Sequence, residues 1–201
     1  MADKSYKWIK IILVVNTIIL IGFVFYSISM GSHYIWDSVI SMFVFYTVFF
    51  IRKKIDLHPF HYFLFAIFLI VHNLGVFSYG DLGSLYATFP LGMEYDFWVH
   101  TYFGFISSLI LYRAFYYYKV NSPYFIIVAV LVVTLGFSAF HELVEYAGAL
   151  TLGKGEGLLF IGAGDIDTWD TQKDLLNNLI GGMIGLAFYG TWNSMKKRKF
   201  I

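Results

Sequence analysis

The sequence predicts an all-α fold, an integral membrane bundle of six transmembrane helices with both chain termini in the cytoplasm. Hydrophobic residues make up 59% of its 201 residues and charged residues only 13%, about half of the charge that a soluble domain carries. A helix needs roughly 20 apolar residues to cross the hydrocarbon core, and the chain contains six long apolar runs. The basic residues alternate between the connections, which indicates the orientation.

The six apolar runs are hydrophobic around the whole helix circumference rather than along one stripe, which indicates lipid on most sides. They cover residues 8–28, 35–51, 62–77, 97–118, 124–150 and 175–192 of a single domain, 1–201. Strands that cross a membrane would show short segments of alternating polarity instead. The first run follows lysines, as in a signal peptide, but it is longer than a signal core and lacks a small-residue cleavage site, which favours a retained helix.

The positions of Lys and Arg predict the orientation, because cytoplasmic connections hold the positive excess. Twelve of the 14 basic residues lie at or near the start of the first run, after the sixth run, or in and beside the second-to-third and fourth-to-fifth connections. We therefore expect both termini in the cytoplasm, in an inner or plasma membrane, and the loops 30–34, 78–96 and 151–173 outside. Eleven of the 13 acidic residues fall on the outer side, which orientation does not require, since Asp and Glu contribute little to it.

Composition also argues against several kinds of site. The formal net charge of +1 does not suit a nucleic-acid-binding surface, which needs an excess of Lys and Arg. The absence of cysteine excludes disulfides, thiolate metal ligands and a cysteine nucleophile. Membrane lipid is the expected partner, and the sequence does not indicate an oligomeric state.

Ionisable side chains collect at the outer ends of the later runs. Asp96 and His100 are four residues apart and share one helical face at the start of the fourth run. Glu142 and Glu145 are three residues apart and share a face near the end of the fifth run. Asp174 stands at the start of the sixth run. Counting along the spans therefore places these groups at one depth, in the outer third of the membrane.

A bound cation would explain this convergence. An ionised side chain near the bilayer centre costs roughly 2.5–3.5 kcal/mol, and carboxylates at one depth repel one another unless they are neutralised. Imidazole nitrogen together with carboxylate oxygen suits zinc, iron or manganese. The predicted ligands of such a divalent metal are His72, His100, Glu142 and Asp174. Asp96 and Glu145 are candidates for a catalytic role as a general base, and they could also be ligands or groups that orient a ligand.

Other interpretations stay open at this point. Carboxylates at helix ends can reach the headgroup region and remain solvated. The same acids would also suit uptake of a cation or proton by a transport protein, or the satisfied polar core of a structural subunit. His141 is either a ligand or a general base. We interpret Asp37 as an interfacial residue, and Gly181, Gly182 and Gly185 as a face for close helix packing.

Four segments resemble the YjdF-like family of small inner-membrane proteins. They are His72-Asn-Leu-Gly75, Tyr95-Asp96-x-x-x-His100, Phe137-Ser-Ala-Phe140-His-Glu142-Leu-Val-Glu145-Tyr146, and Gly164-Asp165 through Asp174. A more distant similarity to VanZ-like membrane proteins rests on Asp96-x3-His100 and Asp174-x3-Asn178. Both resemblances imply a small membrane protein, and neither brings a known reaction.

The leading functional hypothesis is a metal-dependent hydrolase acting on a lipid or lipid-linked substrate. A metal at headgroup depth would lower the pKa of a bound water to about 7 and polarise a phosphoryl or acyl group. The alternatives are a protein that binds or transports a cation or proton, and a structural membrane subunit without catalysis.

Overall fold

The computed structural model describes residues 2–30, 35–76, 85, 88–152 and 169–198. These residues are helical, without a β-strand among them, which confirms the predicted all-α fold. The elements are α1 (Ala2–Ser29), α2 (Ile35–Ile51), α3 (Pro59–Val76), the short 3₁₀ turn η3 (Pro90–Gly92), α4 (Tyr95–Tyr117), α5 (Pro123–Leu152) and α6 (Asp170–Arg198).

Most of the helices extend beyond the apolar runs that predicted them, whereas α2 coincides with its run. α3 begins at Pro59 rather than at residue 62, because proline suits the first helical turn, where its missing N–H has no intrahelical partner to lose. α6 begins at Asp170 rather than at residue 175, and an acidic residue is favoured in the first turn by the helix dipole. A helix can continue into the polar region after its apolar run has ended.

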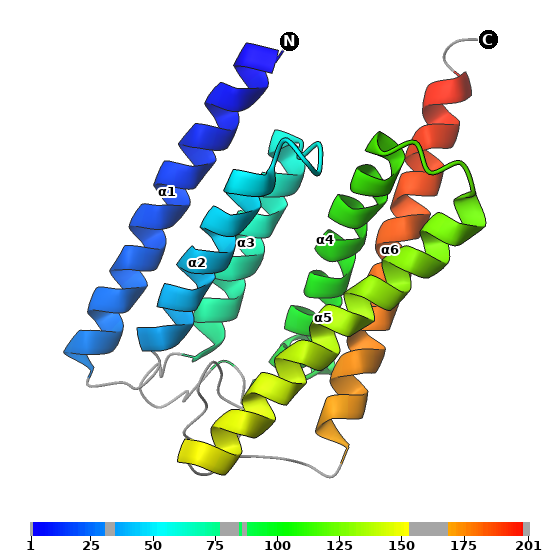
Figure 1. The fold of residues 1–201 in the computed structure, drawn as a ribbon. Helices are drawn as coiled ribbons and strands as arrows, with labels where there is room; N and C mark the ends of the chain where they lie inside the picture. Colours follow the sequence, from blue (N-terminus) through cyan, green and yellow to red (C-terminus); the bar gives the residue numbers. More distant parts are fainter. Residues whose placement is uncertain (1, 31–34, 77–84, 86–87, 153–168, 199–201) are drawn as a thin grey trace.

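The helices form two groups of three, which Figure 1 shows side by side. α1, α2 and α3 pack on one another, α4, α5 and α6 do the same, and α3 packs on α4 between the groups. The start of α1 and the end of α6 lie at the same end of the bundle (Figure 1), called here the terminal end. The opposite end, where α4 and α6 begin, is called the polar end.

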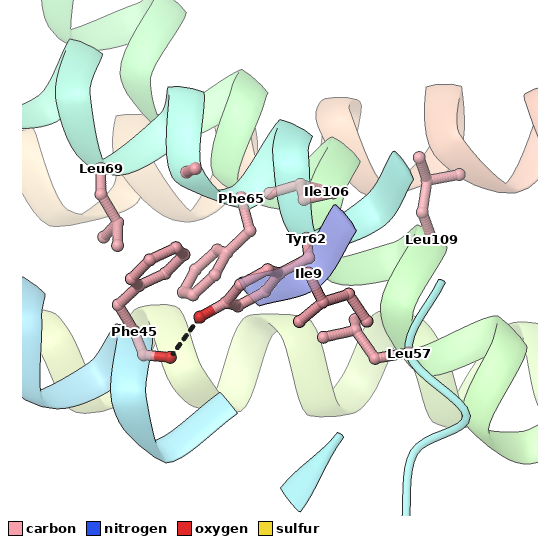
Figure 2. Packing of buried hydrophobic residues seen from close by; sticks show 9 residues of the cluster. Ile9, Phe45, Leu57, Tyr62, Phe65, Leu69, Ile106 and Leu109 are labelled. Carbon is pink, nitrogen blue, oxygen red and sulfur yellow. Dashed lines mark hydrogen bonds between the residues drawn. The ribbon is translucent and has the colours of Figure 1, made fainter. Parts of the chain in front are cut away.

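Aromatic packing joins the first group of helices to α4. The ring of Phe45 in α2 stacks parallel to that of Tyr62 in α3, with the ring centroids 4.4 Å apart. The Tyr62 hydroxyl also donates to the backbone oxygen of Phe45 at 3.3 Å, as Figure 2 shows. Ile9 of α1 and Leu109 of α4 belong to the same buried cluster. The core therefore holds four helices together through large apolar side chains, which dominate packing energies.

The backbones of α4 and α6 touch where they cross. A Cβ placed on Gly104 would lie 2.1 Å from the backbone oxygen of Asn178, and one on Gly181 would lie 1.9 Å from that of Thr101. Both distances are far below any real carbon–oxygen contact, and the obstacle is rigid backbone in each case. Small residues allow this kind of approach between membrane helices, so only glycine fits these two positions.

The same face of α6 continues the close packing, as the sequence predicts. A Cβ on Gly185 would lie 2.0 Å from the hydroxyl oxygen of Ser108. A Cβ on Gly182 would lie 3.1 Å from the Leu131 side chain of α5, which can shift more easily than backbone. The predicted packing role of the α6 glycines is thereby confirmed.

Several helices have the length and polarity of membrane spans. Two segments, Tyr6–Ser29 and Pro123–Val144, are long and apolar enough to cross a membrane, and two shorter helices, Ile35–Ile51 and Pro59–Gly75, are also apolar. Phe43 and Phe50 on α2 are 71% and 72% exposed. Large apolar side chains on the outside of a bundle suit a lipid environment. α4 and α6 are less apolar because each carries a polar face, and these two faces meet inside the protein.

Candidate metal centre

The polar faces of α4 and α6 meet around the imidazole of His100. Its Nε2 lies 3.4 Å from Oδ1 of Asp96 on the same helix and 3.6 Å from Oδ1 of Asp174 on α6. His100 and Asp174 are buried, and Asp96 is half-buried. One ligand atom from each of the three residues lies within 4.8 Å of the other two. A single cation can therefore contact all three after small side-chain movements.

Asn178 holds the other side of the His100 ring. Its Nδ2 lies 2.8 Å from Nδ1 of His100, and it donates to the backbone oxygen of Asp174 at 2.8 Å and to Oγ of Ser138 at 2.6 Å. The Asp174 carbonyl can only accept, so the amide nitrogen is assigned to the side facing it, and Nδ1 of His100 then accepts from that nitrogen. In this arrangement the proton of neutral His100 is on Nε2 and faces the two carboxylates.

A second group of ligand atoms shares His100 and extends to α5. His100, His141 and Glu142 each offer one atom, and these atoms lie within 4.8 Å of one another. The ring centroids of His100 and His141 are 6.1 Å apart. The hydroxyl of Thr171, in the first turn of α6, donates to Oε2 of the buried Glu142 at 3.1 Å. His100 is therefore common to two overlapping groups from three helices.

The glycine crossing explains why these side chains meet. Gly104 lies one turn after His100 on α4, and Gly181 lies about one turn after Asn178 on α6. Because the two backbones touch at these glycines, the side chains one turn nearer the polar end are within hydrogen-bonding distance of each other. The packing motif and the polar site are thus parts of one arrangement.

Four of the six predicted site residues come together in these groups. They are Asp96, His100, Glu142 and Asp174. His72 belongs to neither group: it is buried on α3, with its ring centroid 5.9 Å from that of Phe68. α3 packs against α1, α2 and α4, whereas Asp174 is carried by α6, which packs against α4 and α5. The side chain of Glu145 and residues 153–168 of the predicted outer loop 151–173 lie outside the described part of the structure.

Asp37, which we interpret from the sequence as an interfacial residue, is buried inside the protein. It is only 2% exposed, whereas Trp36 beside it is 61% exposed, so Asp37 lies on the inward side of the first turn of α2. The next turns of α2 are joined to α3 through Asn73, which accepts from Ser38 at 2.8 Å and donates to Ser41 at 2.8 Å. Asn73 also donates to the backbone oxygen of Leu69 at 2.7 Å. Buried polar groups are paired in this way when they are removed from water.

A cavity of about 400 Å³ begins beside His100 and extends between the two groups of helices. The polar residues toward the polar end of its wall are Ser41, His72, Asp96, His100, Ser138, His141 and Asn178. His72 and His141 therefore share one space with the His100 site. The volume lies in the range of small-molecule binding sites.

A further polar contact lies at the terminal end and was missed in the sequence. Arg113, near the end of α4, pairs with Asp56 through Nη2 and Oδ2 at 2.7 Å, and its Nε donates to the Asp56 backbone oxygen. The Tyr189 hydroxyl of α6 lies 3.3 Å from Nε2 of His61 on α3. The sequence did place Asp56 and Arg113 on the same predicted side of the membrane. Because they are 57 residues apart, nothing in the sequence indicated that they are in contact.

Replacing Arg113 with alanine is expected to lower the free energy of unfolding by about 0.5–1 kcal/mol, a value typical of partly exposed ion pairs. The two side chains are 31% and 44% exposed, so water screens their attraction. Equilibrium unfolding in mixed micelles would measure the change. Lys54→Ala removes the same charge from an exposed position nearby and serves as the control. Equal stability of the two variants would show that the Arg113 contact does not hold the helices together.

The chain matches a family model and one curated relative. The model described as "Predicted membrane protein (DUF2238)" matches residues 11–194. The inner membrane protein YjdF of Escherichia coli (strain K12) is 30% identical over 130 residues, which cover 57% of this chain and 60% of that protein. The chain thus spans about 60% of the length of the curated relative that it matches. No solved structure matches it.

Proposed function

This chain belongs to the DUF2238 family of predicted membrane proteins, and from that premise we propose that it is a divalent-metal hydrolase acting on a lipid or lipid-linked substrate. The observation that carries the proposal is the pair of His and carboxylate groups that share His100 at the end of a mostly apolar cavity. Its resemblance to YjdF-like proteins, which the sequence predicted, is confirmed. The similarity to VanZ-like proteins stays a prediction.

The donor set supports zinc, iron or manganese as the metal. Nitrogen from His100 and oxygen from Asp96 and Asp174 is a mixture that suits these ions. Two carboxylates beside one imidazole are also repulsive when both are ionised, and a divalent cation removes that repulsion. Binding through Nε2 of His100 would displace the proton that faces the carboxylates, since metal ligands must be deprotonated.

The surrounding residues have distinct proposed roles. His100 is the ligand common to both groups, with Asp174 as its partner in the first group and Glu142 of α5 in the second. Asp96 belongs to the first ligand group and is half-buried at the cavity wall, so it is placed either as a third ligand or as a general base toward a water molecule. The metal would polarise the substrate's acyl or phosphoryl oxygen and make that water more acidic. Hydrolysis adds the water across the ester bond and releases an acid and an alcohol.

The proposed placement in the membrane is six spans with the polar end outside. The polar faces of α4 and α6 turn toward each other, so their charged groups avoid the lipid, as charged groups within membrane proteins do. The start of α1 and the end of α6 lie at the terminal end of the bundle, where the excess of Lys and Arg favours the cytoplasm. The metal site would then lie close to the headgroups of the outer leaflet.

Metal analysis of the purified protein tests the site. We expect about one zinc, iron or manganese ion per chain in detergent-purified protein prepared without chelator, measured by inductively coupled plasma mass spectrometry. Asp174→Asn keeps the shape of the side chain and removes its charge, so the metal should be lost. Asp170→Asn, one turn earlier on the same helix and outside both groups, should retain it.

Unchanged metal content after replacement of both Glu142 and Asp174 by alanine would refute the assignment of these residues as metal ligands. The reaction has a separate test, in which the metal-loaded protein is incubated with vesicles of phosphatidylethanolamine and phosphatidylglycerol. Mass spectrometry should detect a chelator-sensitive hydrolysis product that the Asp174→Asn variant does not form. Metal binding without any such product would support the metal site and reject the proposed lipid hydrolysis.

One observation favours a second candidate, reversible binding of a proton or cation. Nε2 of His100 lies between two carboxylate oxygens at 3.4 and 3.6 Å, which suits a proton shared among the three groups. This candidate predicts no stoichiometric metal in the native protein. It also predicts that Asp174→Asn changes proton uptake, measured with a pH-sensitive dye, while the metal content stays at zero.

A further inference from the structure

We propose that the cavity beside His100 binds one hydrocarbon chain of a lipid, which enters sideways from the bilayer between α2 and α5 and places its polar head at His100. This inference extends the proposed function. Only the hydrolysis at the polar head of the lipid depends on that function. Binding of the chain depends on the apolar walls and requires no metal.

The walls of the cavity match a molecule with one polar end and an apolar body. The polar groups gather around His100 at one end. Away from that end, the wall is formed mainly by apolar side chains of α2, α3 and α4, including Val44, Val48, Ile51, Phe65, Ile110 and Leu111. Ser107 is the hydroxyl-bearing residue in this apolar part. A hydrocarbon chain would be removed from water along these walls, and that burial supplies affinity.

The cavity is also long. On α4 its lining runs from Asp96 to Leu111, a length of about 22 Å at 1.5 Å per residue. That length suits an extended hydrocarbon chain with its polar head at His100.

The entrance is on the side of the bundle. α2 packs on α1 and α3, and α5 packs on α4 and α6. Residues of both α2 and α5 line the cavity, and the described parts of these two helices do not pack extensively on each other. Val44 of α2 and Phe137 of α5 line the cavity and are nevertheless 39% and 56% exposed. The cavity therefore reaches the surface between these helices. In a membrane this surface faces lipid, so a chain can enter without crossing water.

Photochemical crosslinking tests the inference. The probe is a palmitic acid analogue with a diazirine group midway along its chain, added to the full-length protein in phosphatidylcholine nanodiscs. We expect adducts, mapped by mass spectrometry, to concentrate on the inner wall at Val48, Ile51 and Ile110. Ser107→Phe places a large ring in the apolar part of the cavity and should lower the yield of these adducts by about tenfold. Val44→Phe obstructs the entrance and should have the same effect if Ser107→Phe does not fold.

Thr47→Phe is the matched control, because Thr47 is exposed and lies next to the cavity-lining Val48 on α2. This variant should keep the native adducts. Adducts spread evenly over outward-facing residues such as Phe43, or unchanged adducts in folded Ser107→Phe, would overturn the inference.

The experiment is repeated with chelator-treated protein to separate the two proposals. Inner-wall adducts that persist in a protein shown to bind no metal would support chain binding while the metal enzyme fails. A metal-loaded protein with evenly spread adducts would support the metal site and reject the chain-binding cavity.

Discussion

Replacing Gly181 with alanine is expected to force α4 and α6 apart and to abolish metal binding. The new Cβ would lie 1.9 Å from the backbone oxygen of Thr101, and backbone cannot move aside as a side chain can. Overpacking of this kind costs about 1–3 kcal/mol or more. Moving the helices apart by a fraction of an ångström also separates His100 from Asp174 and Asn178. Equilibrium unfolding in mixed micelles and metal analysis would record the two effects.

Gly190→Ala provides the control on the same helix. A Cβ at Gly190 has nothing within 4 Å, and alanine favours a helix over glycine by up to about 1 kcal/mol. This variant should therefore equal or slightly exceed the native stability and keep its metal. A Gly181→Ala protein that behaves like Gly190→Ala would mean that α4 and α6 do not cross as closely as described.

Replacing His100 with alanine is expected to have the largest effect on the candidate site. His100 belongs to both ligand groups, so its removal leaves neither group complete. The amide nitrogen of Asn178 keeps the backbone oxygen of Asp174 and the hydroxyl of Ser138 as acceptors, so the expected effect is on metal binding rather than on this amide. Stoichiometric metal should be lost, as measured by mass spectrometry of the purified protein.

Two further histidine variants show which group holds the metal. His141→Ala disrupts only the second group, so metal retained in this variant identifies Asp96, His100 and Asp174 as the site. His58→Ala removes an exposed histidine at the terminal end, which lies outside both ligand groups, and should leave the metal content unchanged. Metal that survives in His100→Ala but is lost in His58→Ala would place the binding elsewhere and contradict the site at the polar end.

The candidate site was largely predictable because helical spacing and span counting are local properties. The four-residue separation of Asp96 and His100 places both on one face in any helix. Counting the spans then places Asp174 at the same depth, and the structure brings its carboxylate to 3.6 Å from His100. His72 lies at the same depth and lines the same cavity as His100, but its ring stacks on Phe68 and it belongs to neither ligand group, because depth does not determine where a side chain points.

Contacts that depend on neighbouring helices were harder to foresee. The role of Asn178 requires α6 to lie against both α4 and α5, where it reaches His100 and Ser138. The contact of Arg113 with Asp56 likewise joins segments that are 57 residues apart. Asp37 looked interfacial because it begins an apolar run, but the packing of α2 buries it.

The sequence by itself determined the helical class, the approximate helices and the side chains that share a helical face, because hydrophobic runs and residue spacing act within one segment. The tertiary structure decided that α4 and α6 cross at glycine backbones, that His100 stands between Asp96 and Asp174, and that a cavity separates α2 from α5. These features depend on the fit of surfaces from distant segments. In lipid that fit comes from close packing and interhelical hydrogen bonds rather than from hydrophobicity, which every span shares.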